Sequence, residues 1–116
     1  MSRRVLTVRQ PWASLIVAGI KPVENRTWPT RHRGRLLIHA GLEIDREGMA
    51  LHEHRFGDEP PLGVILGEIE VLDCVRGSRS RWADPDQWNW VLANPIEWRQ
   101  PVPARGRLGL WTIIDP

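Results

Sequence analysis

The sequence predicts a single α+β domain, a compact mixed β-barrel of five to six strands with two or more flanking helices. The chain has 116 residues, 41% of them hydrophobic, which is enough for one core without disulfide or metal support. Most apolar runs have the length and β-branched content of strands, whereas only two segments have helical spacing. No internal repeat or long linker interrupts the chain, so we expect one domain spanning residues 1–116.

The first part of the chain alternates between strand and helix patterns. Residues 4–9 have the alternation of a strand, and Pro11 suits the first turn of a helix that ends at Gly19. Residues 23–28 and 35–40 are then predicted to form the second and third strands.

The middle of the chain is predicted to contain a surface helix and a long strand. Residues 45–55 are mostly charged and suit a surface helix that ends near Gly57, and residues 58–61 predict a loop. Residues 63–75 are mostly Val, Ile and Leu, with Gly67 as a candidate bulge of the kind that bends strands in barrels.

The last third is predicted to contain two strands separated by a connection. Residues 87–92 alternate so that Trp88 and Trp90 share one face. Three prolines between residues 95 and 103 indicate a connecting segment, and residues 108–114 predict the closing strand.

Composition excludes several classes of protein. No run of eighteen apolar residues is present, so a membrane span is not expected. The arginines near the start are not followed by an apolar segment, which argues against an export signal. Cys74 is the only cysteine and cannot form an intramolecular disulfide. We therefore expect a reduced, cytoplasmic setting.

The basic residues are concentrated in the first third of the sequence. Residues 1–40 carry eight Lys or Arg against one acid, whereas residues 41–75 carry two against nine. This asymmetry suggests a basic face that attracts phosphates, although folding can also disperse these charges. Lys21 is the only lysine, and an amine can act as a base where a guanidinium cannot.

The densest polar cluster lies between residues 19 and 28. Lys21 falls in the turn after the first helix, and Glu24 and Arg26 point to one side of the strand that follows. With Trp28 they can form a pocket wall, or they can be a solvated ion-pair network of little energetic value.

Four segments together resemble the ASCH domain, which has a PUA-like fold. They are residues 6–16, the turn of residues 19–26 with its G-x-K-x-x-E-x-R pattern, residues 34–40 and residues 106–111. The resemblance runs through almost the whole chain. It implies a PUA-like β-barrel with a cleft beside the first helix and an association with RNA or other nucleic acid.

One bacterial branch of the family looks like an amidohydrolase that removes the acetyl group from acetylcytidine. Its lysine in this turn corresponds to Lys21, but Glu24 stands where that branch has a threonine nucleophile. A different hydrolytic scheme would use Lys21 or Glu24 as base and Arg26 to stabilise an oxyanion. Asp84 and Asp86 are candidate acids, although Asp-Pro-Asp is better explained as a turn, and ribonuclease chemistry from the same residues is a further option.

Binding without chemistry needs fewer assumptions. A base taken out of its stack needs aromatic surfaces and hydrogen-bonding groups at its edge. The aromatic candidates are Trp12, Trp28, Trp88 and Trp90, although a place in the core is the better interpretation of each. The edge-binding candidates are Glu24, Asn25 and Asn89, and the candidates for holding phosphates are Arg9, Arg31, Arg33 and Arg35.

Three hypotheses follow. The first is a module that binds RNA, single-stranded nucleic acid or a nucleoside in a cleft lined by Lys21, Glu24, Arg26 and Trp28. The second is a small hydrolase acting in the same cleft, and the third is a protein-interaction module. We expect no cofactor. We also expect no metal at His39, His52 and His54, because His52 and His54 lie on different sides of the predicted helix and the composition offers no clustered partners.

Overall fold

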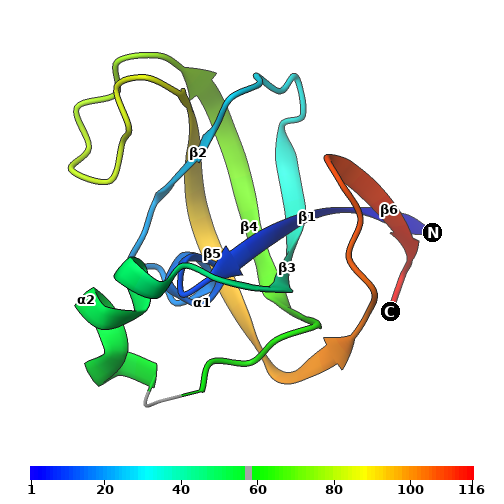
Figure 1. Ribbon diagram of the computed structural model, residues 1–116. Coiled ribbons are helices and arrows are strands. Elements are labelled where there is room, and N and C mark those ends of the chain that lie inside the picture. The colour runs from blue at the N-terminus through cyan, green and yellow to red at the C-terminus, as the bar shows by residue number, and fades with distance from the viewer. Residues whose placement is uncertain (57–58) are drawn as a thin grey trace.

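The computed structural model describes residues 1–56 and 59–116, and the side chains of Glu53, His54 and Phe56 are outside this description. The elements in chain order are β1 (Ser2–Gln10), α1 (Trp12–Val17), β2 (Val23–Arg26), β3 (Gly34–Ile44), α2 (Arg46–Phe56), β4 (Val64–Val75), β5 (Trp88–Pro103) and β6 (Leu110–Ile114) (Figure 1). The α+β class predicted from the sequence is confirmed.

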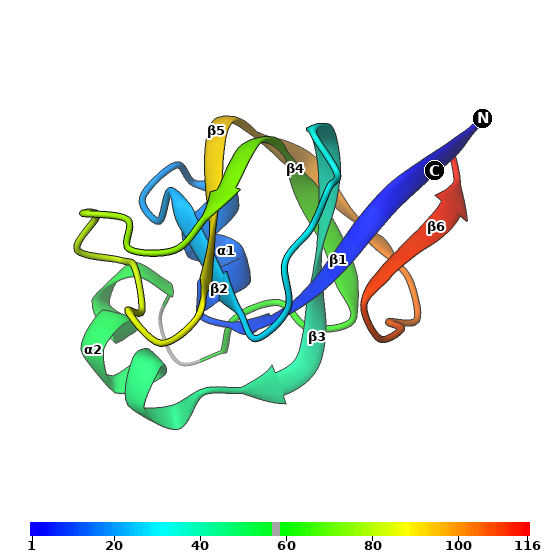
Figure 2. The same cartoon turned by 90° about the horizontal axis from the view of Figure 1, so that it is seen from above.

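The strands form one strongly curled mixed sheet in the order β2-β5-β4-β3-β1-β6 (Figure 2). β1 and β3 are parallel, and the other neighbouring strands are antiparallel. The sheet is not closed into a complete barrel, because no ladder of backbone hydrogen bonds joins β2 to β1 among the described residues. This open seam between β1 and β2 is where the candidate site lies.

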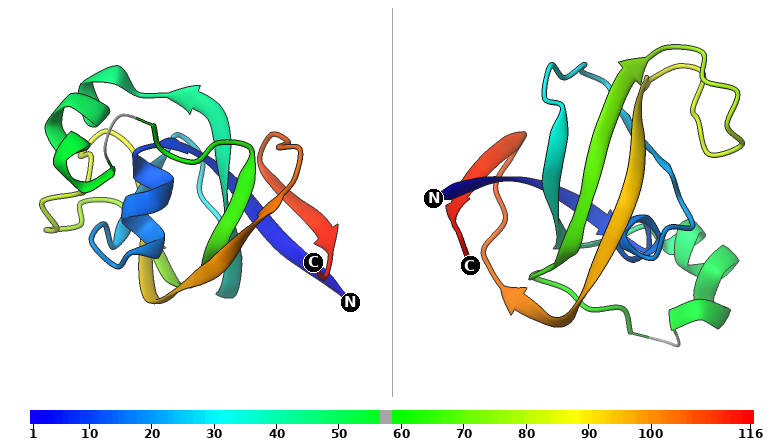
Figure 3. Two further views of the ribbon diagram at one scale, coloured as in Figure 1. Left: turned by 90° about the horizontal axis from the view of Figure 1, so that it is seen from below. Right: turned by 180° about the vertical axis from the view of Figure 1, so that it is seen from behind.

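Side chains from both faces of the central strands are buried. The larger core packs α1 against residues such as Leu6, Leu36 and Ile38, and the view from below shows α1 lying against the sheet (Figure 3). The smaller core lies on the opposite face and contains Val5, Leu37, Ile65 and Trp111. Burial on both faces explains why these strands have continuous apolar runs instead of strict alternation.

The bulge predicted at Gly67 is confirmed. The β3–β4 and β4–β5 ladders both shift register between Ile65 and Gly67. A Cβ atom on Gly67 would lie 2.2 Å from the carbonyl oxygen of Ile96, so the backbone of β5 approaches more closely than any side chain allows. The bulge helps β4 to bend, which contributes to the curl of the sheet.

The prediction of a connecting segment after residue 92 is wrong, because β5 continues to Pro103. β2 pairs with β5 only as far as Val91, so beyond that point β5 has β4 alone as its neighbour. A strand with one free edge tolerates proline, since the missing N–H can fall on the side that has no partner.

Other boundaries differ by a few residues from the predicted ones. β2 ends at Arg26, and β6 begins at Leu110. The predicted helix end near Gly57 and the start of the predicted loop at Asp58 lie outside the described residues. None of the described helices has both the length and the apolar character needed to cross a membrane.

Candidate functional site

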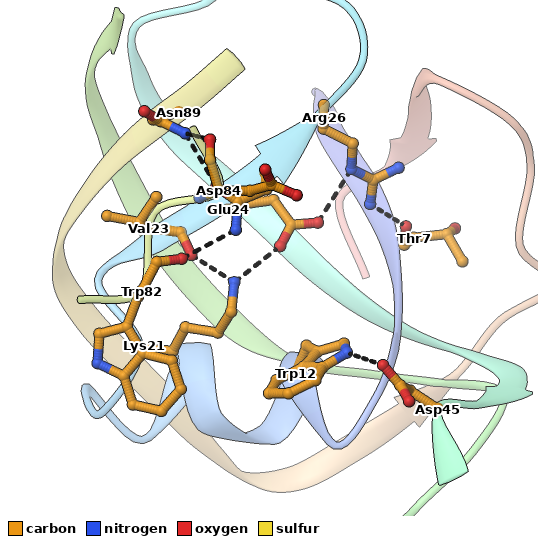
Figure 4. Close-up of polar contacts among 11 residues, drawn as sticks. Thr7, Trp12, Lys21, Val23, Glu24, Arg26, Asp45, Trp82, Asp84 and Asn89 are labelled. Atoms are coloured by element: carbon orange, nitrogen blue, oxygen red, sulfur yellow. Dashed lines mark hydrogen bonds and ion pairs between the residues drawn. The ribbon is translucent and has the colours of Figure 1, made fainter. Parts of the chain in front are cut away.

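The side chain of Arg26 spans the open seam of the sheet. Arg26 ends β2, and its Nη2 donates a hydrogen bond of 2.7 Å to the carbonyl oxygen of Thr7 in β1 (Figure 4). Its Nε donates to Oε2 of Glu24 at 2.9 Å. A guanidinium with a fixed fork of donors therefore joins two strands that lack a backbone ladder.

Lys21 and Glu24 form a buried ion pair beside this bridge. α1 is followed by Gly19, whose positive φ of 80° is favourable only for glycine, and the backbone N–H of Lys21 bonds the carbonyl of Leu15 at 3.1 Å. Lys21 and Glu24 are each only 6% exposed, and the Lys21 Nζ lies 3.2 Å from Glu24 Oε1. The Lys21 ammonium also donates to the carbonyl of Val23.

The ring of Trp12 forms the next part of the wall. The Lys21 Nζ lies 5.8 Å from the centre of this ring, within the range of a cation–π contact. The indole N–H of Trp12 donates to Oδ2 of Asp45 at 3.1 Å, and Oδ1 of Asp45 accepts from the N–H of Gly48 at 3.1 Å. Asp45 therefore caps α2 and fixes Trp12 at the same time.

These contacts lower the pKa of Asp45. The largest cause is the hydrogen bond from the backbone of Gly48, and desolvation opposes it. The indole of Trp12 and the positive charge of Arg9 lower the pKa further. Asp45 is therefore held as a carboxylate at neutral pH.

A pair of asparagines holds the loop between β4 and β5. Asn25 donates from Nδ2 to the carbonyl of Trp82 at 2.9 Å, and its Oδ1 accepts from the backbone of Asp84 at 3.0 Å. Nδ2 of the fully buried Asn89 donates to Oδ1 of Asn25 and to the carbonyl of Asp84, both at 3.0 Å. This irregular loop is therefore fixed by buried side chains.

A second polar network lies behind Thr7. Trp111 donates its indole N–H to Oγ1 of Thr7 at 3.0 Å, and this oxygen lies 3.2 Å from Nδ1 of His39. Nε2 of His39 lies 2.6 Å from the carbonyl of Ala104, so it must be the donor there. Thr7 and His39 face the cleft, but His39 is only 1% exposed, so the network chiefly braces β1, β3 and β6.

The cleft at the seam has a volume of about 1070 Å³. Its rim carries exposed arginines from three parts of the chain: Arg9, Arg81, Arg105 and Arg107. Glu24 and Asp45, two of the acidic residues that line it, are already engaged by Lys21, Arg26, Trp12 and Gly48. The rim is therefore suited to negatively charged ligands.

The structure gathers most of the predicted site residues. Seven of them line the cleft, namely Arg9, Trp12, Lys21, Glu24, Asn25, Arg26 and Trp28. Of the two candidate acids, Asp84 lines the cleft and Asp86 does not. The Asn25 and Asn89 amides proposed to read a base edge are instead engaged with the loop.

Four predicted binding residues lie away from the cleft lining: Arg31, Arg33, Trp88 and Trp90. Trp90 is fully buried in the larger core, where its ring meets Trp28 edge-on at 5.0 Å. Trp88 packs at the border of that core, with Arg76 over its ring. Arg33 forms an ion pair with Asp73. Arg35 was also a candidate for holding phosphates, and its Nε lies 3.5 Å from Oε1 of Glu68.

Sequence reasoning missed several residues of the cleft. Trp82 stands in a polar, irregular segment, and a lone tryptophan in such a setting is a usable signal of a surface role. Asp45 is the first residue of the predicted helix and directly precedes α2 in the structure, and an aspartate at the start of a helix is a usual signal of a cap. Arg105 and Arg107 gave no such signal, because only folding brings the β5–β6 loop to the seam.

The described residues contain no group of three or more His, Cys, Asp or Glu side chains able to hold a metal ion. His39 is engaged with Thr7 and Ala104, and the His54 side chain lies outside the described residues.

Comparison with known proteins gives a consistent match. The family model for the ASCH domain matches residues 6–102. Activating signal cointegrator 1 is 32% identical in Homo sapiens and 31% identical in Mus musculus, over 93% of this chain. The match spans only 22% of those longer relatives.

Solved structures of similar fold include the ASCH protein of Zymomonas mobilis and a point mutant of it. Both have a TM-score of 0.57 and cover 87% of this chain, at 17% and 18% identity. The match covers 73% of the first protein and 75% of the mutant. At this identity the likeness concerns the fold.

Proposed function

The chain belongs to the ASCH domain family, and from this premise we propose that it binds single-stranded RNA, with one nucleotide held in the cleft at the open seam. The observation that carries the proposal is the combination of a buried polar floor with a basic rim. Lys21, Glu24 and Arg26 supply the floor, and exposed arginines supply the rim.

The floor has polar groups suited to the edge of a base. An ammonium has three hydrogens, and the hydrogen bonds described for Lys21 use two of them, while its contact with the Trp12 ring is a cation–π contact. One donor is therefore left for an acceptor on a ligand. Glu24 accepts from Lys21 and Arg26, yet a carboxylate has further lone pairs for a donor. A few fixed polar groups of this kind in a concave site are typical of small-ligand recognition.

The rim has groups suited to phosphates. Arg9, Arg81, Arg105 and Arg107 lie on β1, the β4–β5 loop and the β5–β6 loop, all at the cleft. Phosphates on either side of a bound nucleotide would meet these guanidinium groups. Contacts of this kind release counterions, so the proposal requires affinity that falls as salt rises.

The hydrolase alternative uses the same floor but is less well supported. Lys21 would have to act as a base through a free lone pair, whereas it donates hydrogen bonds to Val23 and Glu24. Incubation with acetylcytidine and with a short RNA, followed by chromatography, tests this alternative, and any product lost in Lys21→Arg would favour it.

Fluorescence anisotropy with a short labelled single-stranded RNA, measured over a range of salt concentrations, tests the binding proposal. Arg105→Gln should weaken binding and reduce the slope of log affinity against log salt by about 0.7, the value for one phosphate contact on a single strand. Arg99→Gln is the matched control, an exposed arginine of β5 that does not line the cleft. Salt-insensitive binding, or equal losses in the two variants, would contradict the proposal.

A further inference from the structure

Trp82 is a half-exposed tryptophan on the irregular loop between β4 and β5, and it lines the cleft. Hydrogen bonds hold its backbone at both the N–H and the carbonyl group. The N–H of Trp82 donates to Oγ of Ser80 at 3.2 Å, and the carbonyl accepts from Asn25 at 2.9 Å.

The loop as a whole is held by buried polar groups. Oδ1 of Asn89 accepts from the backbone N–H of Ser78 at 3.1 Å, while Nδ2 donates to the carbonyl of Asp84. Burying a side-chain amide is favourable only when its hydrogen bonds are satisfied. The amides of Asn25 and Asn89 form these bonds with the loop, which they hold in place. The fold thus holds the backbone of Trp82 in a fixed position beside the cleft, which lowers the conformational entropy that this loop must lose when a ligand stacks on the ring.

A second ring, that of His52 in α2, contacts Trp82 and Trp12 at once. The centre of the His52 ring lies 5.7 Å from that of Trp82 with an interplanar angle of 31°, and 5.8 Å from that of Trp12 with an angle of 75°. The imidazole is therefore tilted over one indole and edge-on to the other. Arg81 also lies near this site, with its Cζ 4.9 Å from the centre of the Trp82 ring.

We propose that Trp82 and Trp12 form a stacking subsite for one unpaired nucleobase, and that His52 occupies this subsite in the ligand-free protein. Imidazole is a planar heteroaromatic ring, as a base is, and its contact with two indoles shows what kind of group fits there. The ligand class is therefore a base that is single-stranded or turned out of its helix. This inference rests on the proposed binding of RNA and adds the place where the base lies.

The position of Trp12 supports this assignment. Asp45 holds its indole N–H, and a Cβ on Gly48 would come within 2.5 Å of its ring, so the first turn of α2 packs directly on Trp12. Trp12 is therefore fixed by the helix that carries His52. A base that replaces His52 would meet one ring fixed by α2 and one fixed by the β4–β5 loop.

The test compares two labelled RNAs of equal length, one with normal bases and one with abasic sugars, on wild type and on Trp82→Ala. Trp82→Ala should bind the normal RNA about 5- to 150-fold more weakly, the range for loss of one stacked base, and should bind the abasic RNA unchanged. The matched control is Trp88→Ala, which removes a tryptophan of β5 that does not line the cleft. A 2-aminopurine in the normal RNA should be quenched by wild type and less so by Trp82→Ala.

His52→Ala separates the two parts of the inference. If His52 stands in the place of the base, its removal leaves affinity for the normal RNA equal or tighter, and a fivefold loss would overturn this part. Salt-dependent RNA binding that is the same for Trp82→Ala and wild type would overturn the subsite while leaving the proposed function intact. Absence of RNA binding by the wild type would overturn both. Near-ultraviolet circular dichroism of each variant verifies the fold, and Trp82→Phe, which keeps a ring, should restore most of the affinity.

Discussion

Replacing Glu24 by Gln should destabilise the protein more than replacing its partner Lys21. Glu24 and Lys21 are each 6% exposed, so both charges are largely removed from water. In Glu24→Gln the Lys21 ammonium keeps the Val23 carbonyl and the Trp12 ring but loses its carboxylate. In Lys21→Met, by contrast, Glu24 keeps Arg26 at 2.9 Å.

The loss of unfolding free energy in each variant depends on the contacts that remain to the buried charge. Removing one partner of a buried ion pair costs about 3–5 kcal/mol when the other charge is left without compensation. Lys21 would keep a carbonyl and a ring, so we expect about 2–3 kcal/mol for Glu24→Gln. For Lys21→Met we expect about 1 kcal/mol or less, because no buried charge is left alone.

Urea unfolding followed by tryptophan fluorescence measures both effects. Glu24→Gln should lower the unfolding midpoint by about 1–2 M, given the usual slopes for domains of this size. The double variant should be about as stable as Lys21→Met alone, because removing the ammonium removes the reason for the loss. A larger loss in Lys21→Met than in Glu24→Gln, or additive losses in the double variant, would refute this reasoning.

Three further predictions concern the surroundings of the cleft. Because the pKa of Asp45 is lowered in the folded state, its charge stabilises the fold above about pH 5, and this contribution is lost as the pH falls below about 4. Urea unfolding at a series of acidic pH values should therefore show a shrinking difference in stability between wild type and Asp45→Asn. Gly48→Ala should lower the melting temperature although alanine has the better helix propensity, because the added Cβ would lie 2.5 Å from the Trp12 ring. Adding Trp12→Phe to this variant should recover part of the loss. Thr7→Val should cost about 1–3 kcal/mol in urea unfolding by leaving buried polar atoms such as Nδ1 of His39 without a partner, whereas Thr7→Ser should cost less.

Each of these three predictions has a result that contradicts it. An unchanged difference between wild type and Asp45→Asn at all pH values would exclude the stabilising role of the charge. A rise in melting temperature for Gly48→Ala would mean that α2 moves freely away from Trp12. Equal stability of the Val and Ser variants at Thr7 would show that the hydroxyl contributes nothing to the network.

The local pattern of the sequence was enough for most elements. Residues 4–9, 35–40 and 64–75 are strands in the structure, because their apolar content suits burial in a sheet and depends little on distant partners. The end of β5 could not be predicted, because proline is tolerated there only through the lack of a second neighbouring strand, which is a property of the sheet order.

The candidate site likewise has parts that the sequence predicts and parts that only the tertiary structure decides. The sequence by itself determined the family and the turn that places Lys21, Glu24 and Arg26 together, because Glu24 and Arg26 share one strand and Lys21 lies in the turn just before it. Only the tertiary structure decided that Trp90 belongs to the core and that Trp82 belongs to the cleft. Strand alternation gives the face of a side chain but not which face is covered, and a loop is placed by hydrogen bonds from distant residues such as Asn25. The basic rim likewise exists only because the curled sheet brings distant loops to one seam.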